Sequence, residues 1–346
     1  MGNFGGRTGQ IDGQTIKTCV LRDGIADILG QVNVLGLDSS WLLSSPLRFF
    51  CSARAGIRDS SRNIMLPGCR GLQILLPLFM HWKTKFNKPL QYVVVGGWLP
   101  QLLAAKPWLR RLCARLDGIY VETAAMAQAL DGMGLTNVEV MPNFRKFDRS
   151  ANFEFPAVGR PLKLVFYSRV MPEKGVEEAI LAVAKLNQPC PDEPRVTLDV
   201  YGPIVGRYKE RFQSLLRTAP SARYGGVLPP DQAPQTLRAY DLMLFPTYYE
   251  GEGFPGAVLD SFIAGVPVIA SDWKYNREII ADGKTGVFCH IRCVKDIAAR
   301  VQAFIDNPER VLPMRRHCVE QALKHHVNIA VQQLLTSKRC LPKIEK

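Results

Sequence analysis

Short apolar runs alternate along the whole chain with longer stretches in which apolar residues recur every three or four positions. The short runs predict β-strands, and the longer stretches predict amphipathic helices. Strands that alternate with helices are typical of parallel sheets covered by helices on their faces. We therefore expect an α/β protein.

The predicted strands fall into two groups, and residues 144–161, polar and without a period, are expected to link them. The first group comprises QVNVLGLD, LQYVVVGG, DGIYVET and NVEVMPN, and the second comprises LKLVFYSR, RVTLDVYG, ARYGGV, DLMLFPT, VPVIASD and TGVFC. From about Asp296 the pattern indicates helices, which can cover either domain. In such folds ligands bind at the carboxyl ends of strands, so candidate residues are sought there.

Composition narrows the class of protein. A chain of 346 residues that is 47% hydrophobic has room for two cores. Its formal charge of +13 indicates anionic partners, which are nucleotides, nucleic acid or an acidic membrane surface. Nucleic acid ranks last, because the basic residues are dispersed and no recognised binding motif accompanies them.

The cysteines and apolar runs bear on location. Nine scattered cysteines without a CxxC pair, and no secretory signal, favour a cytoplasmic protein with reduced thiols. The most apolar run, Gly71 to Met80, has about half of the roughly 20 residues that span a bilayer, so we expect a soluble or peripheral protein. Cys289, His290 and Cys293 do not have a usual zinc spacing, and we expect no metal.

A pair of cations follows the first strand of the second group. That strand ends at Arg169, and Lys174 and Gly175 precede a helix. A lysine there opposes the helix macrodipole, so a bound anion would explain its position. Arginine and lysine together suit a diphosphate. A solvated basic loop balanced by neighbouring glutamates explains the same residues equally well.

The stretch from Tyr248 to Asp272 carries acids beside a glycine-rich turn. Pro255 suits a first helical turn, and Gly265 suits the end of a helix from Gly256 to Ala264. Asp260 lies away from that helix's apolar face and is expected to face a ligand. A carboxylate accepts from two vicinal hydroxyls, as in a ribose, and Glu252 is placed to accept from sugar hydroxyls. Ordinary surface acids are the alternative.

Arg169, Lys174, Glu252 and Asp260, set within EGFPGAVLDSFIAGVPVIASD, resemble the motifs of the retaining family 4 (group 1) glycosyltransferases. The likeness extends from about Pro161 to Gly286 and is weaker before it. It implies a GT-B fold, in which two Rossmann-like domains face each other across a cleft. Residues 1–145 would form the acceptor-side domain together with a C-terminal helix, about residues 325–346, that returns to it. Residues 160–324 would bind the nucleotide-sugar donor.

The resemblance also implies roles for single residues. Arg169 and Lys174 would hold the donor diphosphate, and Asp260 would hold the ribose. Glu252 and the turn Gly253, Phe254, Pro255 and Gly256 would hold the transferred sugar, although Pro255 has no amide hydrogen to donate. Arg169, Lys174 and Glu252 would be the catalytic residues. Gly5, Gly6 and Gln14 would lie on the acceptor side, after the first strand.

Three departures from the family pattern stand out. Asp260 replaces the family's second glutamate and is one methylene shorter. The glycine-rich segment MGNFGG opens the chain where relatives have a first strand, so we expect this strand to be missing or truncated. Many relatives carry a histidine near the sugar, whereas the only histidine here before residue 290 is His81, expected to be structural.

The resemblance predicts transfer of a sugar to a glycan or lipid-linked acceptor with retention of configuration, in polysaccharide biosynthesis. No cofactor is expected, and no metal, because the sequence contains no Asp–x–Asp triplet. The basic amphipathic stretch Lys106 to Gly118 suits either an anionic membrane at the inner face of the plasma membrane or a solvated surface. A nucleotide-sugar epimerase and a non-catalytic, nucleotide-sugar-binding partner of a polysaccharide assembly complex are the alternatives.

Overall fold

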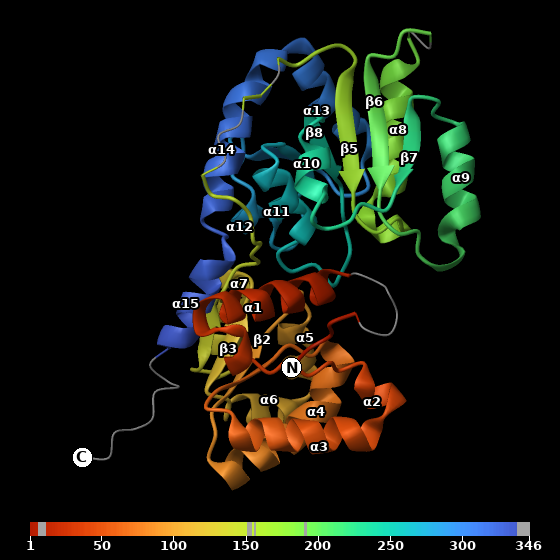
Figure 1. Cartoon of the computed structure of the whole chain (residues 1–346). Helices are drawn as coiled ribbons and strands as arrows, with labels where there is room; N and C mark the ends of the chain where they lie inside the picture. The colour runs from red at the N-terminus through yellow and green to blue at the C-terminus, as the bar shows by residue number, and fades with distance from the viewer. Residues whose placement is uncertain (6–11, 151–153, 156, 190–191, 338–346) are drawn as a thin grey trace. The chain divides into compact units, whose positions relative to one another are not determined.

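The computed structural model describes residues 1–5, 12–150, 154–155, 157–189 and 192–337 (Figure 1). The chain forms two compact units. Unit 1 comprises Met1–Lys146, Gly251–Pro255 and His325–Lys346, and unit 2 comprises Phe147–Glu250 and Gly256–Lys324. The five residues Gly251–Pro255 therefore belong to unit 1, although the chain on both sides of them belongs to unit 2.

Unit 1 contains a four-stranded parallel sheet in the order β1-β2-β3-β4. Its strands are β1 (Asn63–Met65), β2 (Leu90–Val93), β3 (Gly118–Val121) and β4 (Val138–Val140). Met1 contacts the remaining edge of β1, where its amino group donates to the Ile64 carbonyl at 2.7 Å and its carbonyl accepts from Leu66 at 2.9 Å. Burial lowers the pKa of this amino group to about 6.

The helices of unit 1 connect and cover this sheet. They are α1 (Gly13–Leu29), η1 (Gln31–Asn33), α2 (Trp41–Ser44), α3 (Pro46–Asp59), α4 (Cys69–Phe86), α5 (Leu99–Ala105), α6 (Pro107–Cys113), α7 (Ala124–Asp131) and α15 (Val327–Thr336). Helix α15 contacts α1 although the two lie near opposite ends of the chain (Figure 1). Val327 and Val331 of α15 share a core with Leu21, Val93 and Tyr120. Burial of this apolar face holds the C-terminal helix to unit 1.

A cavity of about 600 Å³ lies in unit 1. Its walls come from Met1, α1, α3, residues 33–37 and β1. The hollow opens to solvent, and two of its lining residues, Leu29 and Leu35, are exposed.

Unit 2 contains a six-stranded parallel sheet in the order β10-β9-β8-β5-β6-β7. Its strands are β5 (Leu162–Tyr167), β6 (Val196–Tyr201), β7 (Ala222–Gly226), β8 (Leu242–Phe245), β9 (Val268–Ser271) and β10 (Gly286–Cys289). The four central strands are almost entirely buried, as expected for a parallel sheet with helices on both faces.

Helices follow the strands of unit 2. They are η2 (Pro172–Lys174), α8 (Val176–Asn187), η3 (Gly206–Tyr208), α9 (Lys209–Arg217), α10 (Ala233–Leu237), α11 (Gly256–Ile263), α12 (Asn276–Ile279), α13 (Val294–Asp306), η4 (Pro308–Arg310) and α14 (Val311–Leu323). Helices α8 and α13 contact each other, and α11 contacts α10 and α14. Leu164, Val183, Val301 and Phe304 are among the fully buried side chains of the main core.

Three local predictions were wrong. QVNVLGLD is not a strand, because it begins with η1 and exposes Val32 (96%) and Leu35 (70%), so its apolar side chains face solvent instead of a core. Only its last residue, Asp38, forms a bridge, with Gly2. The short strand β1 was missed. Phe144, expected in the linker, is buried in the core of unit 1.

No helix in the described part of the chain has both the length and the apolar character that a membrane crossing requires.

Candidate functional site

The topology of unit 2 places a natural binding position between β5 and β8. These strands are neighbours, but the chain continues outward from β5 to β6 on one side and from β8 to β9 on the other. At such a switch point the connections after the two strands diverge, which opens a crevice at their carboxyl ends. The segments that reach this position are residues 168–175, after β5, and residues 246–250, after β8.

Both predicted cations lie at this position, around one aromatic ring. The guanidinium carbon of Arg169 is 4.9 Å from the ring centre of Tyr249, and the Lys174 ammonium is 4.8 Å from the same centre. Lys174 is only 6% exposed. The structure therefore brings Arg169 and Lys174 together, and it adds Tyr249, which the sequence analysis did not single out.

Backbone contacts hold the two segments in place. The Tyr248 amide donates to the Glu173 carbonyl at 2.8 Å, and the Trp273 indole donates to the Tyr249 carbonyl at 3.0 Å. Gly175, which precedes α8, has φ +77°, and a Cβ there would lie 2.2 Å from the Pro246 carbonyl oxygen. Only glycine tolerates both that conformation and that contact. The close approach keeps Lys174 beside the end of β8.

Helix α11 begins and ends close to the predicted residues. It starts at Gly256, directly after Pro255, and ends at Ile263, two residues before Gly265 with φ +69°. Asp260 is 3% exposed and belongs to unit 2, whereas Glu252 is 6% exposed and belongs to the Gly251–Pro255 segment of unit 1.

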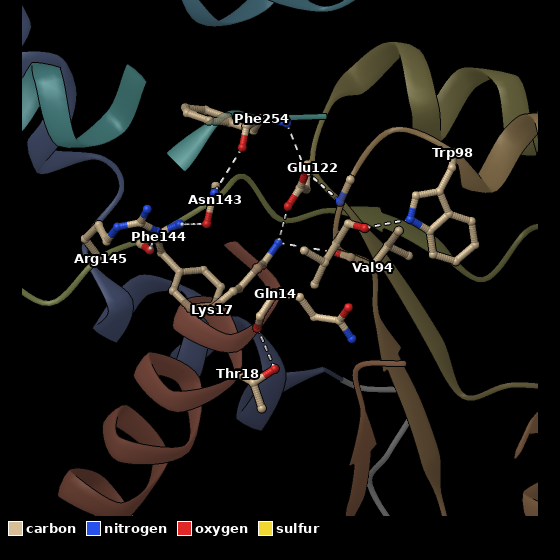
Figure 2. A network of polar contacts seen from close by, with 12 residues as sticks. Gln14, Lys17, Thr18, Val94, Trp98, Glu122, Asn143, Phe144, Arg145 and Phe254 are labelled. Carbon is tan, nitrogen blue, oxygen red and sulfur yellow. Dashed lines mark hydrogen bonds and ion pairs between the residues drawn. The ribbon is translucent and has the colours of Figure 1, made fainter. Parts of the chain in front are cut away.

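The Gly251–Pro255 segment is held within unit 1 by Glu122, which directly follows β3 (Figure 2). One carboxylate oxygen of Glu122, Oε2, accepts from the Phe254 amide at 2.9 Å and from the Gly96 amide at 3.2 Å. The other, Oε1, lies 2.6 Å from the Lys17 ammonium. Both oxygens of one buried carboxylate are thus engaged.

Three further contacts hold this segment. The Asn143 side-chain amide donates to the Phe254 carbonyl at 3.0 Å (Figure 2), and the Gly97 amide donates to the Gly251 carbonyl at 3.2 Å. The Phe254 ring also packs edge-on against His325, with 4.9 Å between ring centres. The segment is therefore anchored at its first and fourth residues, on either side of Glu252.

Lys17 enters this network from helix α1. Its side chain is fully buried, and its ammonium donates to the Val94 carbonyl at 3.0 Å (Figure 2) as well as to Glu122. Helix α1 begins where the Asp12 carboxylate accepts from the Thr15 amide at 2.8 Å, a common N-cap. The ion pair thus joins the first helix of unit 1 to the carboxyl ends of β2 and β3.

The structure describes two of the three residues predicted on the acceptor side, Gly5 and Gln14. Gln14 lies in the first turn of α1 and donates to the Leu66 carbonyl at 2.9 Å. Gly5 has φ +79°, and its amide donates to the Asn3 side chain at 3.0 Å. Gly6 lies outside the described residues. His81 is exposed on α4.

Sequence reasoning missed Lys17, Glu122 and Asn143. A signal existed for Glu122, which is an acid at the end of an apolar run in DGIYVET, the same kind of position that identified Arg169. Lys17 gave no such signal, because a single lysine in a helical pattern is usually solvated.

The Cys289 to Cys293 region does not form a metal-binding cluster. His290 Nδ1 lies 2.7 Å from Asp296, and Cys289 is buried, which raises the pKa of its thiol to about 12. No group of three or more potential metal ligands occurs among the residues that the structure describes.

Proteins of similar sequence include glycogen synthase from Mycobacterium tuberculosis, which is 29% identical over 226 residues that cover 62% of this chain and 51% of that protein. 2-Deoxystreptamine glucosyltransferase from Streptomyces kanamyceticus is 25% identical over 62% of this chain and 57% of its own length. D-Inositol 3-phosphate glycosyltransferase from Nocardia farcinica is 26% identical over 65% of this chain and 53% of its own length. The chain thus spans about half the length of these relatives.

Among solved structures, HepE from Anabaena in complex with UDP-glucose superimposes with a TM-score of 0.71 at 17% identity, covering 95% of this chain and 96% of HepE. A mutant of TarM from S. aureus gives a TM-score of 0.64 at 18% identity, covering 83% of this chain and 57% of TarM. The fold shared with these structures is GT-B. A profile of the family described as glycosyl transferases group 1 matches residues 148–325, just over half of the chain. The chain belongs to the group 1 glycosyl transferases.

Proposed function

We propose that this protein transfers a sugar from a nucleotide-diphosphate sugar to a glycan or lipid-linked acceptor, with retention of configuration, in polysaccharide biosynthesis. The observation that carries the proposal is the pair Arg169 and Lys174 around Tyr249 at the β5/β8 switch point. Two fixed cations at this crevice suit a diphosphate. HepE, whose fold this chain shares, has been solved with UDP-glucose, and UDP-glucose is a donor of the class proposed here.

The cations would act on the leaving group. When the bond between the anomeric carbon and the diphosphate breaks, negative charge develops on the leaving phosphate oxygens. Arg169 and Lys174, held by Tyr249 and by the close approach of Gly175 to Pro246, need little rearrangement to meet that charge. Preorganised donors of this kind commonly contribute about 3 to 4 kcal/mol to catalysis.

The family resemblance assigns the remaining donor contacts. Asp260 would accept from the ribose hydroxyls, and Glu252 from the hydroxyls of the transferred sugar. In the structure the Phe254 amide donates to Glu122, so we leave it out of the sugar contacts. In the proposal the transferred sugar is bound by Glu252 and by the amides of Gly253 and Gly256.

Retention would follow if the acceptor hydroxyl enters on the face from which the diphosphate leaves. Its proton then passes to a phosphate oxygen, and no separate protein base is required. The same scheme needs no metal ion, because Arg169 and Lys174 supply the positive charge. Addition of EDTA or manganese should change the rate by less than about twofold; a large loss with EDTA would contradict the metal-independent scheme.

Thermal unfolding in the presence of different nucleotide sugars tests donor binding first. A ligand at a hundred times its dissociation constant adds about 2.7 kcal/mol to stability, which moves the melting temperature by several degrees. Turnover with the best donor is then compared between the parent, Arg169→Ala and Arg217→Ala. Arg217 is an exposed arginine at the end of α9 and serves as the control.

The proposal expects Arg169→Ala to lose at least a hundredfold in turnover, about 2.7 kcal/mol, and Arg217→Ala to remain near the parent. Parent-like turnover of Arg169→Ala would contradict the assigned role. Donor binding without turnover would identify a non-catalytic nucleotide-sugar-binding protein. Conversion of the donor to an isomer without an acceptor would identify an epimerase.

We also propose that a lipid-linked acceptor is reached at the inner face of the plasma membrane, through α6. On α6 Trp108 is 45% exposed, Arg111 is exposed and Leu109 packs inward, and Arg115, two residues after the helix, is exposed as well. Each cation near an anionic surface contributes about 1 kcal/mol of binding. Sedimentation with vesicles that contain phosphatidylserine should carry the protein down, whereas neutral vesicles should not; equal sedimentation with both would contradict the proposal.

A further inference from the structure

The chain leaves unit 2 at Glu250, enters unit 1 for the five residues Gly251–Pro255, and returns to unit 2 at Gly256. Glu122, Asn143 and Gly97 of unit 1 form hydrogen bonds with this segment, and these bonds hold Gly251 and Phe254, on either side of Glu252. Residues of unit 1 therefore fix the backbone that carries Glu252.

Glu122 makes the central contact, and its geometry needs a carboxylate. Oε2 accepts from two backbone amides, those of Phe254 and Gly96, while Oε1 accepts from Lys17. A glutamine in its place would turn an NH₂ group toward one of these donors. The contact is also tight, because a Cβ on Gly253 would lie 2.2 Å from Oε2.

Stability alone does not explain the buried Lys17–Glu122 pair, because removing two charges from water costs free energy that their attraction only partly offsets. Both side chains are shut off from water, at 0% and 2% exposure. An apolar pair of similar volume is often as stable as a buried ion pair, or more so. What the ion pair provides and an apolar pair does not is a fixed acceptor directed at the Phe254 amide, with Lys17 compensating its charge (Figure 2).

We propose that Glu122, with Lys17 as its counter-ion, is a positioning residue that sets the conformation of the Gly251–Pro255 segment and hence the place of Glu252 in sugar transfer. The inference rests on the proposed function for the role of Glu252, but not for the anchoring itself. The diphosphate contacts belong to Arg169 and Lys174, so losing the anchor should slow the chemical step more than it weakens donor binding.

The test variant is Lys17→Met combined with Glu122→Leu. It removes both charges and keeps the apolar volume, so no unpaired charge is left buried. The matched control is Arg315→Met with Asp241→Leu, a second buried pair, 3.0 Å apart at 1% and 9% exposure, which belongs to unit 2. A third variant, Glu122→Asp, keeps the charge but shortens the side chain, and it tests whether a carboxylate at this position preserves part of the activity that the test variant loses.

Two readouts separate positioning from general stability. The first is steady-state kinetics well below the melting temperature: kcat should fall at least tenfold in the test variant, with the donor KM within threefold, while the control keeps its kcat. Glu122→Asp should recover part of the loss. The second is hydrogen exchange of a peptide spanning residues 251–258, which should become at least tenfold faster in the test variant and remain unchanged in the control.

The outcomes are distinct. A test variant with parental kcat, or with a loss equal to that of the control, would overturn the positioning role. If the parent shows no turnover with any donor, the proposed function fails, and exchange at residues 251–258 still decides whether Glu122 anchors the segment. If that exchange is the same in parent and test variant, the anchor itself is refuted.

Discussion

The Lys17 ammonium lies 2.6 Å from a carboxylate oxygen of Glu122, although the two residues are 105 positions apart in the chain. Helix α1 carries the cation, and the end of β3 carries the anion. Because neither side chain reaches solvent, the two charges depend on each other and on the amides around them. The pair therefore has consequences for stability that are separate from any role in catalysis.

Replacing Lys17 alone by methionine should destabilise the protein by about 3–5 kcal/mol, because it leaves Glu122 as an uncompensated buried charge. Adding Glu122→Leu should recover part of the loss, because it removes the unpaired charge but leaves the Phe254 and Gly96 amides without their acceptor. Urea denaturation at pH 7 measures both effects. The exposed pair Lys146–Asp27, also 2.6 Å apart, is the control, and Lys146→Met should leave the denaturation curve close to that of the parent. Additive losses in the double variant would show that the two buried charges are not coupled.

Gly253→Ala should also destabilise unit 1, by about 1–3 kcal/mol. The new methyl group would lie 2.2 Å from Glu122 Oε2 and 2.8 Å from the Gly96 carbonyl carbon, so the segment or the carboxylate has to move. Gly13→Ala is the matched control, since among the described residues no heavy atom outside its chain neighbours and its own helix backbone lies within 4 Å of its Cβ position. Denaturation curves that coincide for Gly253→Ala and the parent would mean that the segment is not held as described.

Tyr249 should matter for nucleotide binding through its ring and not through its hydroxyl. Tyr249→Phe keeps a π face for Arg169 and Lys174, and calorimetry should give a UDP affinity within about twofold of the parent. Tyr249→Leu removes two cation–π contacts of about 0.5–1 kcal/mol each, so affinity should fall about fivefold to thirtyfold. Equal affinities for the phenylalanine and leucine variants would exclude the ring as the element that holds the two cations.

The sequence predicted those parts of the structure that local patterns determine. The strands of unit 2 alternate with helices, and Pro255 and Gly265 lie next to the ends of α11, because turn and cap residues act on their immediate neighbours. Arg169 and Lys174 were predicted to lie at a strand end, and they do so at the β5/β8 switch point, because parallel strands bring the residues after them to one edge.

What the sequence did not predict depends on tertiary packing. The alternation in QVNVLGLD suggested a strand, but no core covers Val32 and Leu35. Lys17 and Glu122 each look ordinary in their own surroundings, and only the fold places them in contact. The return of Gly251–Pro255 to unit 1 has no local signal, since its glycines and proline fit any turn.

Glu177 and Glu178, neighbours in the first turn of α8, should affect stability in opposite directions. The hydrogen bond from Arg211, together with one from Tyr208, lowers the pKa of Glu177. Glu178 is half-buried, one of its oxygens has no hydrogen-bond partner among the described residues, and burial raises its pKa despite the opposing charge of Arg292. One carboxylate is thus stabilised by folding and the other is destabilised.

The signs follow from proton linkage. A carboxyl whose folded pKa lies below its unfolded value stabilises the protein above that value, about 4.5, and loses the effect as pH falls through the folded pKa. A carboxyl with a raised folded pKa favours folding only while protonated, and destabilises increasingly as pH rises above about 4.5. At pH 7, Glu177→Gln should therefore lower the free energy of unfolding, and Glu178→Gln should raise it. Urea denaturation at pH 7 and pH 4 should show both differences shrinking at the acid end, and a change of the same sign for both variants at pH 7 would contradict the contacts assigned to these glutamates.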